Sequence, residues 1–92
     1  MIVGKVVGNV WATRKEDGLS GMKLMVVRRH DPCTGEDLET IVAVDFIGAG
    51  IGEKVLVATG SSARNVGGSA SQAPVDATIV GIIDEVEVNS GV

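Results

Sequence analysis

A chain of 92 residues is long enough for one small domain and too short for a second hydrophobic core. Twelve acidic and eight basic residues give a net charge of −4, which disfavours binding to nucleic acid unless basic side chains gather in a local patch. The single cysteine excludes an intrachain disulfide and a cysteine-based metal cluster, and no apolar run could span a bilayer, so we expect a cytoplasmic protein.

Hydrophobic alternation and turn residues predict five strands, at residues 1–13, 22–30, 39–46, 54–59 and 77–88. Gly4 and Gly8 interrupt the first strand and favour bends or bulges there. Polar loops are expected at residues 14–21 and 31–38. The first and last strands are expected to be the longest.

Glycine marks two further connections between the strands. Three glycines fall at alternate positions in residues 47–53, which predicts a tight loop. Ser61 or Ser62 can cap a short helical turn that extends through Val66, where a glycine pair follows.

This order of elements lacks the strand-helix-strand alternation of a parallel sheet. It predicts an all-β protein with one short helical turn, folded as a small five-stranded OB-like β-barrel. The expected domain spans residues 1–88, and residues 89–92 form a C-terminal tail. The core must be mainly aliphatic, because Trp11 and Phe46 are the only aromatic residues, and we expect both to be buried.

The fourth and fifth strands are apolar on both faces, unlike a half-buried surface strand, which alternates. A barrel this small covers only its inward face, so outward apolar side chains need another partner, and a second copy of the chain is the least demanding one. The alternative is that the chain's own loops cover them. The expected interface residues are Val55, Val57, Ile79 and Ile83.

Three segments of the chain form a recognisable combination of motifs. Residues 48–64 read Gly-Ala-Gly-Ile-Gly-Glu-Lys-Val-Leu-Val-Ala-Thr-Gly-Ser-Ser-Ala-Arg, and residues 74–84 read Pro-Val-Asp-Ala-Thr-Ile-Val-Gly-Ile-Ile-Asp. Together with the opening residues 1–13, which look like the first strand of the same family, they resemble the EutN/CcmL family of bacterial microcompartment vertex proteins. The resemblance implies a homopentamer at the five-fold vertices of a polyhedral shell whose facets are hexameric shell proteins.

The resemblance also suggests roles for two features of the matched segments. Gly48, Ala49, Gly50, Ile51 and Gly52 would line a narrow opening on the five-fold axis, where small residues let five backbones approach. The alternative is a strained connection that needs glycine for positive φ. Arg64 would reach a neighbouring subunit, and the alternative is a solvated side chain on a short helix.

Nucleotide-binding and catalytic patterns are incomplete in this chain. The third glycine of residues 48–52 comes too early for a dinucleotide fingerprint, and no Lys-Ser/Thr pair completes a phosphate-binding loop, so we expect no cofactor. His30 and Cys33 are three residues apart, without a visible third ligand or catalytic partner. We therefore expect no enzyme activity and no metal site.

The remaining alternative is an OB-type module that binds nucleic acid or another ligand. Residues 28–30, Arg-Arg-His, form a weak basic patch in an acidic chain. Single-strand binding surfaces also present stacking aromatic side chains, which this chain offers only if its two aromatic residues are exposed.

Overall fold

The computed structural model describes residues 1–11, 21–60 and 76–89. Its five strands are β1 (Ile2–Val10), β2 (Lys23–His30), β3 (Asp37–Asp45), β4 (Lys54–Thr59) and β5 (Ala77–Ile82). The predicted helical turn that starts at Ser61 or Ser62, most of the predicted loop at residues 14–21, and Arg64 lie outside the described residues.

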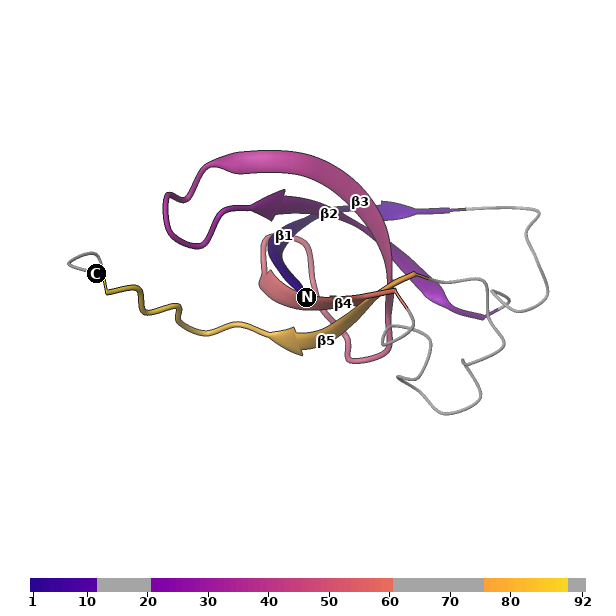
Figure 1. Ribbon diagram of the computed structural model, residues 1–92. Helices are drawn as coiled ribbons and strands as arrows, with labels where there is room; N and C mark the ends of the chain where they lie inside the picture. The colour runs from indigo at the N-terminus through magenta and orange to yellow at the C-terminus, as the bar shows by residue number, and fades with distance from the viewer. Residues whose placement is uncertain (12–20, 61–75, 90–92) are drawn as a thin grey trace.

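The strands close into one barrel in the order β1-β2-β3-β5-β4 (Figure 1), which confirms the predicted five-stranded β-barrel. All neighbouring strands are antiparallel except β3 and β5, which run parallel and pair only at Val44 with Thr78 and Asp45 with Ile79. The β2–β3 hairpin therefore extends past the body of the barrel, because most of β3 pairs with β2 alone.

Several predicted strand boundaries are wrong. The first strand ends at Val10 and does not include Trp11. The strand β3 begins at Asp37, two residues early, because pairing of His30 with Asp37 lengthens the hairpin. The last strand ends at Ile82 rather than at residue 88, and so is among the shortest strands. Residues 83–89 lie outside the strand, although Ile83 still donates a backbone hydrogen bond to the carbonyl of Lys54 in β4. No helix in the described part of the chain could cross a membrane.

The barrel interior is filled by small and medium aliphatic side chains from all five strands. The buried cluster consists of Val6, Met25, Val27, Ala43, Ala49, Val55, Val57, Ala77 and Ile79. Gly4 allows β1 to approach β2 at this core, since a Cβ there would lie 2.5 Å from Cγ1 of Val27 and 2.7 Å from the carbonyl oxygen of Arg28. The irregularity that the glycines predict in β1 lies between Val6 and Gly8, where the register shifts.

Neither aromatic side chain belongs to this core, which corrects the prediction that both are buried. Trp11 is 90% exposed and Phe46 is 43% exposed. Both residues follow the ends of strands, where the barrel wall no longer covers a side chain.

Candidate functional site

The loop between β3 and β4 contains the predicted axial residues 48–52. Gly48 and Gly52 have φ angles of 85° and 95°, in the left-handed region that favours glycine. Gly50 has no positive φ, so backbone conformation does not demand a glycine there. Ala49 is fully buried in the barrel core, whereas Ile51 is 63% exposed. Of the two side chains between these glycines, only that of Ile51 is available to a partner.

Asp45, the last residue of β3, holds the first half of this loop. Its carboxylate accepts hydrogen bonds from the backbone N–H groups of Ile47 (2.9 Å), Gly48 (3.1 Å) and Ala49 (2.8 Å). The side chain is fully buried, and Nζ of Lys23 lies 3.9 Å from Oδ2. This role of Asp45 was not predicted from the sequence, although an Asp before a glycine-rich turn is a recognised signal for such backbone contacts.

The second half of the loop is tied to β1. Oε1 of Glu53 accepts a 2.7 Å hydrogen bond from the N–H of Gly50. Val6 exchanges two backbone hydrogen bonds with the loop, donating to the carbonyl of Glu53 (3.0 Å) and accepting from Gly52 (2.8 Å). With Ala49 inside the core, the loop is a well-held cap on one end of the barrel.

Three of the four described residues that were predicted at the subunit interface lie inside the barrel instead. Val55, Val57 and Ile79 are 0% exposed in a single copy, because they face the barrel interior. They have no surface left for a neighbouring subunit, and the prediction is corrected for all three. Ile83 is half-buried at the end of β5, and its interface role stays a prediction.

Apolar side chains nevertheless remain on the outside of the barrel. Among the described residues, those that are large, hydrophobic and exposed are Met1, Val7, Trp11, Leu38, Val42, Phe46, Ile47, Ile51, Ile82, Val86 and Val88. They come from three of the five strands, β1, β3 and β5, and from the segments that flank or follow these strands, so the chain's described loops leave much of the apolar exterior open. Such a surface is typical of a subunit that associates with others.

Comparison with known proteins relates this barrel to one family. The family model described as "Ethanolamine utilisation protein EutN/carboxysome" matches residues 1–84. The chain belongs to the EutN/CcmL family. The microcompartment shell vertex protein GrpN of Rhodospirillum rubrum is 48% identical over 95% of this chain and 97% of its own length. The carboxysome shell vertex protein CcmL of a Synechocystis strain is also 48% identical, over 99% of this chain and 90% of its own.

Solved structures of EutN/CcmL proteins have the same fold as this chain. The pentameric microcompartment shell protein GrpN of Rhodospirillum rubrum has a TM-score of 0.85 and 47% identity, covering 97% of this chain and 100% of GrpN. CcmL of Gloeobacter violaceus has a TM-score of 0.90 and 40% identity, covering 97% of this chain and 91% of CcmL. This family resemblance was recognisable from the sequence segments alone.

The hairpin loop with His30 and Cys33 has a structural explanation. Oδ1 of Asp31 accepts hydrogen bonds from the N–H groups of Cys33 (2.8 Å) and Thr34 (3.3 Å), which shapes the turn. Cys33 is exposed, and the described residues contain no group of three or more His, Cys, Asp or Glu side chains that could hold a metal ion. The loop therefore gives no geometric support for catalysis.

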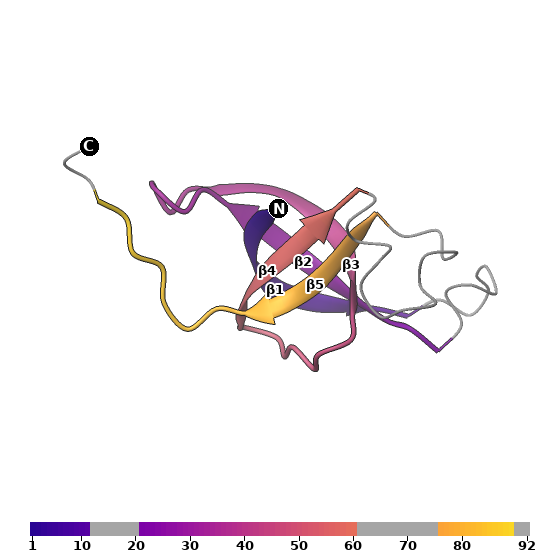
Figure 2. The same ribbon diagram turned by 60° about the horizontal axis from the view of Figure 1, so that its bottom comes forward.

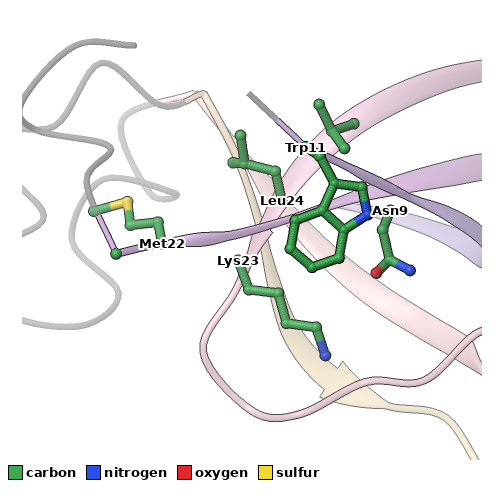
Figure 3. A pocket seen from close by; sticks show the side chains of 7 residues that line it. Asn9, Trp11, Met22, Lys23 and Leu24 are labelled. Atoms are coloured by element: carbon green, nitrogen blue, oxygen red, sulfur yellow. The ribbon is translucent and has the colours of Figure 1, made fainter. Parts of the chain in front are cut away.

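A cavity of about 300 Å³ lies where β1 ends and β2 begins. Figure 3 shows the side chains of Trp11, Lys23 and Leu24 around it. We assign it no ligand.

Proposed function

We propose that this chain is a structural protein that forms homopentamers at the vertices of a polyhedral bacterial microcompartment shell in the cytoplasm. The observation that carries this proposal is its likeness, over nearly the whole of both chains, to a solved pentameric shell protein. The vertex proteins among its sequence relatives support the same function. They favour it over a nucleic-acid-binding OB module.

The exposed apolar side chains support association of identical copies. A contact between two different surfaces of one chain, repeated by rotation, closes into a ring when the rotation angle allows. A shell with flat hexagonal facets needs five-fold elements to close, so the proposed activity is geometric and needs no catalytic group.

The mass of the particle in solution tests the pentamer directly. Light scattering coupled to size-exclusion chromatography is expected to give five times the chain mass at micromolar concentration. A monomer under these conditions would overturn the proposal. A hexamer would keep the ring and contradict the vertex role.

We further propose that the pentamer binds hexameric shell proteins at the corners of the shell. Electron microscopy of shells produced with and without this chain tests that partnership. Closed polyhedra are expected when both components are present, and shells with open corners when this chain is omitted. Shells that close equally well without it would contradict the proposal.

The exposed Trp11 makes the alternative function measurable. Stacking on a base would quench the fluorescence of the only tryptophan in the chain. We expect no change on titration with single-stranded oligonucleotides at low salt. Saturable quenching that high salt abolishes would favour the nucleic-acid-binding module instead.

A further inference from the structure

Three cations lie side by side across the outer face of the barrel. The strand register pairs Lys5 of β1 with Arg28 of β2 on one side and with Lys54 of β4 on the other. All three residues are exposed and border a groove of about 440 Å³. We call Lys54, Lys5 and Arg28 the cationic row.

None of the three cations forms an ion pair within the described part of its own chain, although Asp37 also lines the groove. The two ion pairs found there use Lys23 and Arg29 instead. Like charges on directly opposed residues of neighbouring strands repel each other. In a chain with a net charge of −4, three adjacent unpaired cations indicate a surface that an anionic partner neutralises.

The C-terminal segment offers a partner of complementary charge. Asp84, Glu85 and Glu87 follow β5 and are all exposed. None of their carboxylates lies in an ion pair in the described structure. The segment leaves the sheet where Ile83 donates to the carbonyl of Lys54 (2.8 Å), and Figures 1 and 2 show it running away from the barrel. We call residues 84–87 the acidic tail.

We propose that the acidic tail of one copy binds the cationic row of the next copy in the ring. A cyclic contact joins two different surfaces of the same chain, and the tail and the row are two such surfaces with opposite charge. The tail points away from its own barrel, so it is placed to reach a neighbour (Figure 2). The proposal rests on the proposed homopentamer and names one of its contacts.

Charge reversal on each side of the contact provides the test. Lys5→Glu breaks the row, and Glu85→Lys combined with Glu87→Lys breaks the tail. Each variant is expected to raise the concentration at which half of the pentamer dissociates by about tenfold at low salt. At about 1 M salt, where the Debye length is about 3 Å, the variants and the parent protein should converge. Glu36→Lys, an exposed reversal on the hairpin loop, is the control and should change this concentration less than about twofold.

Mixing the two variants distinguishes a contact between copies from a contact within one copy. The tail variant keeps the parental row, and the row variant keeps the parental tail, so the parental attraction exists only where these two unlike chains meet. We expect the mixture to regain part of the lost assembly. Recovery must be incomplete, because the reverse contact joins the altered tail to the altered row, and both of these surfaces carry a net positive charge.

Each other outcome overturns the proposal. If both variants lose pentamer stability and mixing them restores none of it, the tail binds the row of its own chain. If only Lys5→Glu weakens the pentamer, and inorganic phosphate stabilises the parent pentamer against dissociation, the row is a site for a small anion. If dissociation is unchanged in both variants, the proposed contact does not exist, although the pentamer still does. A parent protein that is monomeric would instead refute the proposed function itself. Circular dichroism verifies that both variants fold.

Discussion

At the scale of single residues, Asp45 does more than any other described side chain to shape the candidate site. It ends β3, lies in the barrel wall, and accepts three backbone hydrogen bonds from the loop that follows. These bonds replace the water that the loop's N–H groups would otherwise bind. One buried carboxylate therefore fixes the conformation of the first half of the loop.

Replacing Asp45 by Ala leaves those three N–H groups without their acceptor. We expect Asp45→Ala to lower the free energy of unfolding by about 3 kcal/mol, measured by denaturant titration at fixed protein concentration. Glu53→Gln is the control, since its exposed side chain accepts a single loop hydrogen bond and can keep it. It should cost less than about 1 kcal/mol. Equal losses in the two variants would contradict the role assigned to Asp45.

The exposed ion pair of the hairpin gives a prediction on pH. The 3.0 Å hydrogen bond from Arg29 holds the pKa of Glu39 below its ordinary value of 4.5. A lowered folded-state pKa stabilises the protein above the unfolded pKa, and this contribution disappears as the pH falls through the folded pKa. The parent protein should therefore be slightly more stable than Glu39→Gln at neutral pH, and the difference should shrink as the pH falls below 4.5 and vanish below the lowered pKa of the folded state. A difference that grew on acidification would contradict this sign.

At the scale of elements, β4 and β5 decide which side chains form the core and which remain for partners. Val55, Val57 and Ile79 fill the interior, whereas Ile82 is exposed at the end of β5. The sequence does not reveal which side chains face inward, because both faces of these strands are apolar and either face could be the buried one. The register shift between Leu56 and Val57 further displaces any alternation.

Substitutions on these strands should separate folding from assembly. Val55→Ala removes methyl groups from the core and should lower the free energy of unfolding by about 2 kcal/mol. Ile82→Asp should leave the circular dichroism spectrum of the barrel unchanged and reduce the pentamer fraction seen by light scattering. Unfolding of the Ile82→Asp variant, with Val55→Ala unaffected, would reverse the assignment of the two residues.

At the scale of the whole molecule, the glycine-rich loop has one role within a single chain and a second, proposed role in the ring. Within one chain it caps the barrel, with Ala49 as the inward side chain. In the proposed ring, residues 48–52 lie near the five-fold axis, with the glycine backbones and Ile51 facing it. That position stays a prediction.

Gly50 is the best probe of crowding at the axis, because its φ is not positive. A Cβ there would meet only Oε1 of Glu53, at 3.3 Å, the end of a side chain that can move. We expect Gly50→Val to lower the pentamer fraction strongly and the monomer's stability only slightly. Gly52→Ala should instead destabilise the fold by about 1–2 kcal/mol through its positive φ. If Gly50→Val stays fully pentameric and forms closed shells, the loop does not crowd the axis.

The hairpin residues His30 and Cys33 should be dispensable for assembly, because the proposed function is structural. His30→Ala and Cys33→Ala are expected to keep the pentameric mass and to form shells with hexameric partners. Loss of a bound metal or of a measurable enzymatic activity in either variant, with the pentamer retained, would contradict this reading of the loop.

The sequence by itself determined the all-β class, the number of strands and the family, because these follow from local apolar runs, glycine positions and the motifs at residues 1–13, 48–64 and 74–84. Tertiary structure decided the rest. Whether Val55 or its neighbours face inward depends on closure of the barrel, and the early end of β5 depends on how far β4 extends beside it. The capping by Asp45 and the cationic row also needed the fold, because strand pairing brings together residues that are far apart in the chain.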